Sequence, residues 1–457
     1  MDFENAKMAK ELGIEWRLEK TEKEMASLTI KDHKPEFPGK VSYRLINPMK
    51  NPMGKVSKVI LQRINREVRE KTGLNQWQST QDSLKWFESL ENKSDMTFFQ
   101  FDIEQFYPSI NEELLRKALT WAEEYSFISE TAKNIIMLAR KTFLFDGQCL
   151  WSKKDNSNFD VSIGSYDGAE ACEIVGLFLL YKLTEKENIF EKKYIGLFRD
   201  DGLSVMTGNG QQNDKRRKEV IRIFKEEGLS ITWEVNLKRV QYLDILFDLD
   251  NECYKPFHKI NSRLLYVGIG SNHPRKVLEN IPEGINRRLS HISSNKKWFY
   301  EEISEYQNAL KVSGYSHILS YEKGLQKSTA RNIHGKCPNK TIHYNQDKNV
   351  KSNINIIWFT PPFNIYCSTN IGEIFRGLID KHFNRNNVLG KLFNKNRLKI
   401  SYSCMPNIKA KIGSHNKALI SNSFKKDIIL KKCIHYNQDK NVKSNRNIIW
   451  FTPPTKP

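Results

Sequence analysis

Apolar residues fall into short runs and helical spacings along the first 330 residues. The run Met96–Ile103 is apolar and rich in β-prone residues, so it predicts a buried strand. Apolar positions recur at helical spacing in Gln62–Lys71 and Leu114–Glu124. Asp214–Glu227 has the pattern of a charged amphipathic helix, and the glycine that follows it is a suitable helix end. The pattern therefore predicts a body of mixed α and β structure.

A β-hairpin is predicted around residues 194–207. The apolar runs Tyr194–Phe198 and Leu203–Thr207 flank the polar turn Arg199-Asp200-Asp201-Gly202. Asp-Gly accepts the positive φ angles that tight hairpin turns require. The remaining body segments continue the mixture, with strands predicted at 229–235 and 240–249 and helical spacing beyond Pro282.

One segment of the chain is repeated almost unchanged. Ile342–Pro362 returns as Ile434–Pro454, 92 residues later, and only Ile354 and Arg446 differ between the copies. Two copies do not build a solenoid, which needs at least three stacked repeats. We interpret the block as a recent duplication of sequence, and we expect the second copy to have nothing to pack against.

Charge divides the chain into two parts. The formal net charge is +20, and residues 331–457 hold 23 basic and 5 acidic side chains. Residues 1–330 hold 50 basic and 48 acidic side chains, so a nearly neutral body carries a strongly basic tail. Such an asymmetry is the electrostatic signature of a polyanionic partner, although a solvated tail without a partner has the same composition.

Composition excludes several classes of protein. Hydrophobic residues make up 39% of the chain, so a disordered or fibrous protein is excluded. No apolar run reaches the ~18 residues of a membrane span, and the N-terminal residues lack a signal-peptide core. The seven cysteines are scattered and form no CxxC pair, so we expect no disulfide and a reducing, intracellular compartment.

Carboxylates stand at the ends of two predicted strands. Asp102 ends the run Met96–Ile103, and Asp200 and Asp201 follow Tyr194–Phe198. If both strands belong to one sheet, Asp102 and Asp200 can meet at the strand ends. Converging carboxylates repel each other unless cations neutralise them, and hard oxygen ligands select Mg²⁺ or Mn²⁺. Two such ions suit phosphoryl transfer, because they clamp the attacking and leaving oxygens.

These motifs resemble those of reverse transcriptases, and their residues are most similar to the motifs of Penelope-like retroelements. Phe101–Ile110 (FDIEQFYPSI) resembles motif A, and Phe198–Leu203 (FRDDGL) resembles motif C. Further blocks resemble, in chain order, the fingers motifs, motif B, the primer grip, the start of the thumb and the connector of these elements: 31–35, 43–48, 163–170, 240–244, 271–274, 356–362, 378–383 and 401–415. The likeness covers roughly residues 25–420.

The resemblance implies metal-binding and catalytic roles. Asp102 and Asp200 would hold two Mg²⁺ or Mn²⁺ ions, and Asp201 would be a supporting catalytic carboxylate. The backbone carbonyl of Ile103 would be a further metal ligand. Tyr107 would pack under the incoming sugar and exclude a 2′-hydroxyl.

The resemblance also implies nucleotide-binding residues. Arg44 would grip the triphosphate, with Lys34 or Lys31 assisting. Gly164 and Gly168 of motif B would let the backbone approach the template base pair closely. The sequence Asp167–Glu170 (DGAE) departs from the Gln-Gly form that is commoner in other reverse transcriptases. This difference leaves the detailed template contact open.

The implied architecture is α+β, a right-hand polymerase fold of fingers, palm and thumb with an antiparallel palm sheet and a basic C-terminal extension. The expected regions are fingers with the N-terminal part (1–95), palm with interleaved fingers helices (96–250), primer grip with thumb-like helices (251–330), and a basic connector or tail that carries the duplicated block (331–457). We expect the chain to lack N-terminal polymerase sequence and the GIY-YIG endonuclease of full-length elements.

Three functional interpretations follow. The first is an RNA-directed DNA polymerase of a retroelement, with RNA template, DNA primer and deoxynucleoside triphosphates as partners, no membrane, and an intracellular location, the nucleus being favoured. The second is an inactive remnant that binds RNA or DNA through its basic tail. The third is an RNA-directed RNA polymerase, which Tyr107 disfavours.

Overall fold

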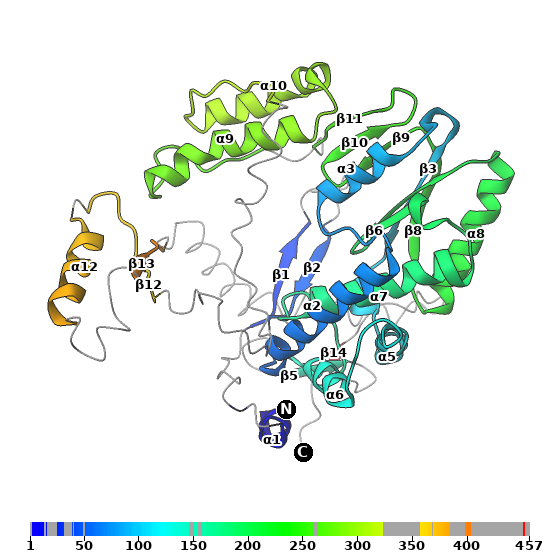
Figure 1. Ribbon diagram of the computed structural model, residues 1–457, viewed down its shortest axis with the longest axis horizontal. Helices are drawn as coiled ribbons and strands as arrows, with labels where there is room; N and C mark the ends of the chain where they lie inside the picture. The colour runs from blue at the N-terminus through cyan, green and yellow to red at the C-terminus, as the bar shows by residue number, and fades with distance from the viewer. Residues whose placement is uncertain are drawn as a thin grey trace, which may run out of the picture. The chain divides into compact units, whose positions relative to one another are not determined.

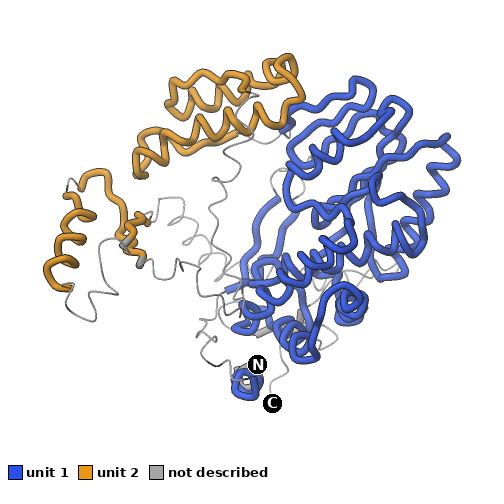
Figure 2. Tube along the Cα trace, in the orientation of Figure 1, with its two compact units in different colours: residues 1–262, 416–457 blue, residues 263–415 orange. Residues whose placement is uncertain are grey.

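The computed structural model describes residues 2–12, 15, 25–31, 39, 41–48, 51–145, 150–153, 158–258, 264–322, 357–367, 369–383, 398–403 and 451–452. Its chain forms two compact units, residues 1–262 with 416–457 and residues 263–415 (Figure 2). Within the described residues, no helix is both long enough and apolar enough to cross a lipid bilayer.

The first unit contains most of the helices. They are α1 (Asp2–Glu11), α2 (Met53–Thr72), α3 (Thr80–Ser89), α4 (Phe106–Ser109), α5 (Glu112–Ala122), α6 (Glu130–Ala139), α7 (Gly168–Tyr181) and α8 (Gly210–Glu226). Short helical turns lie at η2 (Lys93–Asp95), η3 (Lys182–Lys186) and η4 (Lys192–Tyr194). Figure 1 shows their arrangement.

Strands of the first unit form four separate sheets. The strands are β1 (Ser27–Ile30), β2 (Tyr43–Ile46), β3 (Thr97–Ile103), β4 (Leu144–Phe145), β5 (Leu150–Lys153), β6 (Ile195–Phe198), β7 (Asp201–Met206), β8 (Ile231–Leu237), β9 (Arg239–Tyr242), β10 (Ile245–Asp248), β11 (Cys253–Pro256) and β14 (Phe451–Thr452). The sheets have the orders β1-β2, β14-β5-β4, β11-β10-β9 and β6-β7-β3-β8, and every strand pair in them is antiparallel.

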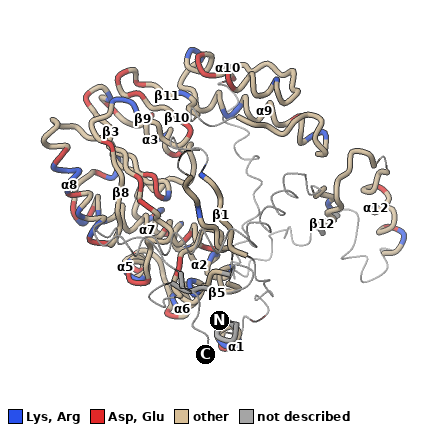
Figure 3. The backbone as a smooth tube through the Cα atoms, turned by 180° about the vertical axis from the view of Figure 1, so that it is seen from behind, with Lys and Arg blue, Asp and Glu red and all other residues tan. Residues whose placement is uncertain are grey.

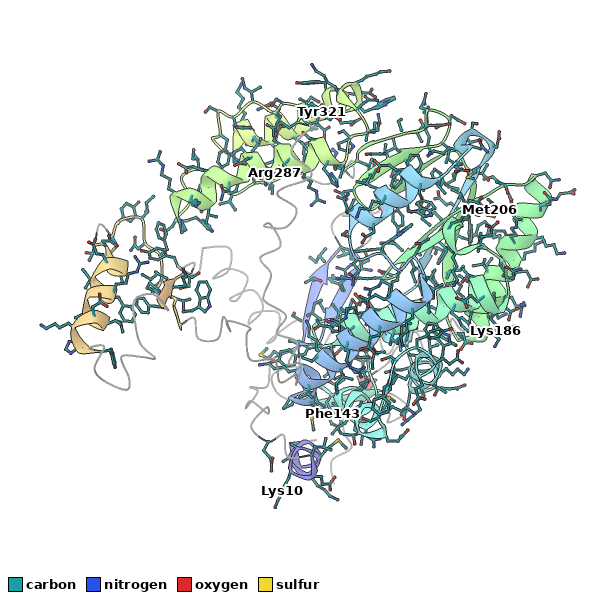
Figure 4. All side chains as sticks on the ribbon, viewed as in Figure 1. Lys10, Phe143, Lys186, Met206, Arg287 and Tyr321 are labelled. Atoms are coloured by element: carbon teal, nitrogen blue, oxygen red, sulfur yellow. The ribbon has the colours of Figure 1, made fainter. Side chains whose placement is uncertain are left out.

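The sheet β6-β7-β3-β8 is the centre of this unit. Phe99, Phe101 and Ile103 of β3 point into a core that α5, α7 and α8 complete. Phe101 packs edge-on against Phe224 of α8 at 5.3 Å between ring centroids. Met206, labelled in Figure 4, is buried at the end of β7. This one-sided burial fixes which face of the sheet is turned away from the helices.

The other face of the sheet is covered only at one end. Phe98 of β3 stacks on Phe87 of α3, which also contacts Phe247 of β10. Towards the other end of β3, Gln100 is half-buried and Asp102 is exposed. The end of the sheet that carries the carboxylates therefore remains open among the described residues.

The second unit contains two separate groups of elements. The helices α9 (Arg275–His291) and α10 (Lys296–Val312) pack on each other, and Pro282 lies inside α9. The strands β12 (Ile357–Phe359) and β13 (Leu398–Ile400) pair in parallel beside α12 (Ile371–His382), where Phe359 stacks on Phe375 at 4.0 Å.

The prediction of mixed α and β structure with antiparallel pairing is confirmed. The predicted strand 240–249 is wrong as a single strand, because the chain reverses between β9 and β10 at Leu243, whose φ is 56°. The duplicated block lies mostly outside the described residues, apart from 357–362 in the first copy and 451–452 in the second. The right-hand arrangement stays a prediction.

Candidate functional site

The predicted carboxylates come together at the open end of the sheet. In the pairing of β3 with β7, Asp102 lies directly opposite Asp201. One residue farther along, the backbone N–H of Ile103 donates to the carbonyl of Asp200 at 3.0 Å. Ladder pairing thus fixes the distance between the two strand ends, and no long-range loop has to hold them in place.

Neighbouring residues decide which way the acids point. Phe101 faces the core and pairs with Gly202, where a Cβ atom would lie 2.1 Å from the Phe101 ring. Side chains alternate along a strand, so the paired Asp102 and Asp201 share the opposite, open face. Asp102 is exposed and Asp201 is half-buried. Asp201, rather than Asp200, is the direct neighbour of Asp102 in the register.

The hairpin turns through two residues. Phe198 and Asp201 form the last pair of β6 and β7, so Arg199 and Asp200 make the turn; we call Phe198–Asp201 the acidic turn. The positive φ lies at Arg199, at 57°, and the expectation that Gly202 would supply it is wrong. Gly202 is instead needed for the close approach of Phe101. A left-handed conformation at a residue other than glycine costs about 1–2 kcal/mol.

Tyr107 lies next to the acidic turn. Gln105 has a φ of 51°, which bends the chain after β3 and starts α4. Tyr107 is half-buried, and its ring would be 3.7 Å from a Cβ at Gly168. Burial raises the pKa of Tyr107 to about 12, and the negative charge of Asp200 adds to the rise. The phenol is therefore neutral at physiological pH, close to Asp200.

Beneath the acidic turn, Cys172 of α7 is fully buried. Burial raises the pKa of its thiol well above the usual value, and the negative charge of Asp200 acts in the same direction. The described part of the chain gives this cysteine an apolar packing role, because a thiol with a raised pKa is a poor nucleophile.

Both glycines of the predicted motif B are constrained by the protein itself. Gly164 has a φ of 111°, and a Cβ there would lie 3.1 Å from the carbonyl oxygen of Asn47. Gly168 begins α7, and its Cβ would lie 2.6 Å from the Ser165 hydroxyl. The backbone of Asn47 donates to the carbonyl of Ile163 at 3.0 Å. Gly164 thus allows this loop to pack against Asn47, directly after β2, and Gly168 allows the loop to fold back closely on Ser165.

A buried ion pair anchors the same loop. Asp167 is completely buried and pairs with Arg140, which is 1% exposed. Burial lowers the pKa of Arg140 to about 10, while negative groups nearby, Asp160 and Glu170 among them, oppose the fall. The side chain of Asp167 is therefore enclosed by protein and positions the start of α7. Sequence reasoning missed Arg140, because a single arginine at the end of an amphipathic helix carries no motif.

The predicted triphosphate-binding residues are only partly described. Arg44 is an exposed residue of β2 and pairs with Thr29 of β1. The backbone of Lys31 donates to the carbonyl of Ser42 at 2.9 Å. Lys34 lies outside the described residues.

A hydrogen-bonded brace supports the acidic turn from the sheet β11-β10-β9. Tyr242 of β9 is fully buried, and its hydroxyl donates to the backbone carbonyl of Asp201 at 2.7 Å. Trp77 contacts Tyr242 at 5.5 Å between ring centroids and lies over Gly196 of β6, where a Cβ would be 2.1 Å from the indole. The backbone N–H of Trp77 donates to Leu197 at 2.9 Å. Of this brace, the sequence indicated only residues 240–244, through their resemblance to a primer grip.

The carboxylate set suits an open magnesium site. Within the residues that the structure describes, no group of three or more His, Cys, Asp or Glu side chains has the arrangement of a metal site. Asp102 and Asp201 supply hard oxygen donors on an accessible face. Mg²⁺ keeps several water ligands and is commonly bound by one or two carboxylates together with substrate phosphates. The residues present therefore fit such an ion.

Basic and acidic residues lie close together on α8. The cluster Lys215–Lys218 lies on α8, where Figure 3 shows blue and red segments close together. Arg217 and Lys218 both pair with Asp214, the latter at 2.9 Å. This cluster is thus partly neutralised within its own helix, as expected for a solvated helix face.

Comparisons with known proteins find distant likenesses to solved structures. No family model and no curated protein matches the chain. A telomerase from Candida albicans, solved with a fragment of telomeric RNA, matches 57% of this chain and 48% of its own length, with 9% identity and a TM-score of 0.41. An RNA-dependent RNA polymerase of a human picobirnavirus matches 50% of this chain and 43% of its own, with 12% identity and a TM-score of 0.36. The chain thus spans less than half the length of these proteins, and likeness at this level identifies no family.

Proposed function

We propose that the chain is an RNA-directed DNA polymerase that adds deoxynucleotides to a primer 3′-hydroxyl. The observation that carries the proposal is the register at the open end of the sheet, where Asp102 faces Asp201 and Ile103 is bonded to Asp200. Asp102 and Asp201 are 99 positions apart, were selected from the sequence for their chemistry, and lie opposite each other in the sheet. The motif order also supports an origin in a Penelope-like retroelement, with the nucleus as the favoured location.

Two divalent ions, Mg²⁺ or Mn²⁺, belong to this proposal. Asp102 and Asp201 would hold them on the open face, with Asp200 and the carbonyl of Ile103 as further oxygen donors. When bound, such ions stabilise the charge that develops on the attacking and leaving oxygens. The protein contributes a rigid pair of strand ends, so the acids need no reorganisation as charge develops.

Other residues would bind and orient the substrates. The ring of Tyr107, held neutral beside Asp200, would lie under the incoming sugar and leave no room for a 2′-hydroxyl. Arg44 and Lys34 would bind the triphosphate, since an arginine can grip phosphate oxygens with two parallel hydrogen bonds. Gly164 and Gly168 have no side chain, so they would let the backbone approach the template closely.

Primer extension on an RNA template in Mg²⁺ tests the proposal. The D102N and D201N variants should each lower the extension rate by at least ~10³-fold, because each removes a charge that holds metal. A matched control is D250N, since Asp250 pairs with Lys238 at 3.6 Å in another turn of the same unit. This control should extend at the rate of the unmodified chain.

The same experiment separates the competing functions. A binder without chemistry would retain labelled RNA and incorporate no nucleotide, in the unmodified chain as in the variants. An RNA polymerase would prefer ribonucleotides in the unmodified chain. Wild-type extension by D102N would show that Asp102 has no metal-binding role.

A further inference from the structure

Arg199 occupies an unusual position in the acidic turn. Six other non-glycine residues of the described chain have a positive φ: Asn92, Gln105, Asn188, Asn236, Leu243 and Glu252. Three of them are asparagines, which tolerate this conformation. Arg199 is the one that carries a positive charge. A two-residue hairpin turn prefers Asn or Gly there, so the arginine is a poor choice for folding alone.

The side chain of Arg199 is accessible to a ligand. Its side chain is exposed, and it forms no ion pair with any residue that the structure describes. The guanidinium lies 5.5 Å from the ring of Phe198, the preceding residue in the chain. Its positive charge counteracts the rise in the pKa of Tyr107 and of Cys172. The charge of Arg199 thus acts on Tyr107 and on Cys172 and Glu173 of α7.

Strained residues that stability does not explain occur preferentially at functional sites. An exposed arginine next to a pair of aspartates is suited to an anionic ligand that the aspartates also tolerate. A phosphate group satisfies both conditions, because divalent ions bridge it to carboxylates while the guanidinium donates to its remaining oxygens.

We infer that Arg199 is a phosphate-binding residue of the acidic turn, which contacts a backbone phosphate of the bound primer or the phosphates of the incoming nucleotide. The inference rests on the proposed function, since it takes a polymerase substrate as the source of the phosphate. It adds to that function a residue that lies outside the predicted nucleotide-binding set.

Two variants remove the charge without straining the turn. R199G accepts the left-handed conformation freely, and R199N retains a polar side chain that tolerates it. Both should raise the melting temperature, by ~2 °C, because the strain is relieved. N188G is a matched control, because it relieves strain at a positive φ without removing a charge. K215A removes an exposed cation from α8.

Binding measurements distinguish the two sources of phosphate. The first arm uses a fluorescent RNA template annealed to a primer that ends in a dideoxynucleotide, so that no chemistry occurs. R199G and R199N should weaken binding of this duplex about tenfold. They should also reduce the slope of log affinity against log salt by ~0.9, the value for one phosphate contact. The second arm adds the next complementary nucleotide and measures its affinity for the complex.

A defect confined to the first arm assigns the contact to the primer backbone, and one confined to the second assigns it to the triphosphate. Affinities and salt slopes equal to those of the unmodified chain in both arms, for both variants, would overturn the inference. Because neither arm needs catalysis, the result is independent of primer extension. If the unmodified chain binds the duplex and extends nothing, the proposed function fails while the role of Arg199 is still measured.

Discussion

The side chain of Tyr107 has two separable properties, a ring and a hydroxyl. The ring is the group proposed to exclude a 2′-hydroxyl, and the hydroxyl has a pKa raised to about 12 by burial. Y107F keeps the ring and should keep the preference for deoxynucleotides. Y107A should raise ribonucleotide incorporation by ~10–100-fold in primer extension, as expected for the loss of a steric contact. Equal discrimination by Y107A and the unmodified chain would exclude Tyr107 as the gate.

The hydroxyl of Tyr107 also makes stability depend on alkaline pH. A free tyrosine titrates near pH 10, so a raised pKa means that the folded chain binds this proton more tightly. The stabilisation is fully present below pH 10 and is lost as the pH rises towards about 12. Urea unfolding at pH 9 and pH 11 should show a smaller fall in the free energy of unfolding for Y107F than for the unmodified chain. An identical fall would place the phenol in solvent.

Tyr242 tests whether the brace positions the acidic turn. Y242F removes the hydroxyl that donates to Asp201 and leaves the ring contact with Trp77. We expect a loss of ~1 kcal/mol in stability and a need for more Mg²⁺ at half-maximal extension. Tyr254 of β11 is the matched control, because its hydroxyl donates to Glu88 at 2.6 Å. Y254F should lose similar stability without changing the Mg²⁺ requirement.

At the scale of single residues, prediction succeeded where chemistry and pattern coincide. The sequence predicts that Asp102 and Asp200 can meet, because both lie at the ends of short apolar runs that suit strands. The direct pairing of Asp102 with Asp201 was not foreseen, since register is set by ladder contacts between distant segments. The pattern of a single strand carries no such information.

At the scale of elements, the contact between β3 and β7 depends on one missing side chain. A Cβ at Gly202 would lie 2.1 Å from the ring of Phe101, whereas a Cβ at Gly210 of α8 would meet nothing within 4 Å. G202A should lower the free energy of unfolding by ~1–3 kcal/mol or more, measured by urea denaturation. G210A should be neutral or slightly stabilising, because alanine is the better helix former. A combined F101L and G202A chain should recover part of the loss.

Elements were predictable to the extent that their own residues determine them. The strand over 96–103 and the helix over 214–227 were expected within a few residues of β3 and α8. The division of 240–249 into β9 and β10 was missed, because Leu243 takes a positive φ that its residue type disfavours. The antiparallel pairing of β9 with β10 holds the turn in this conformation. The helix α9 extends through Pro282, which sequence rules assign to a boundary.

At the scale of the whole molecule, we expect the basic tail to contribute to RNA binding and not to catalysis. The four basic residues within 391–399 belong to the tail, which has a net charge of +18, whereas those at 215–218 share their helix with Asp214. Changing the four tail residues Lys391, Lys395, Arg397 and Lys399 to Gln should weaken RNA binding and lower the salt slope by ~2–4.

The matched control changes Lys215, Arg216, Arg217 and Lys218 to Gln and removes the same charge. It should have a smaller effect on the salt slope, because two of these cations are already paired with Asp214. Extension rates at saturating template should equal those of the unmodified chain for both variants, since the proposed function gives neither group a catalytic role. Equal salt slopes for the two variants would mean that total charge governs RNA binding, in which case the polyanion interface extends over the body as well as the tail.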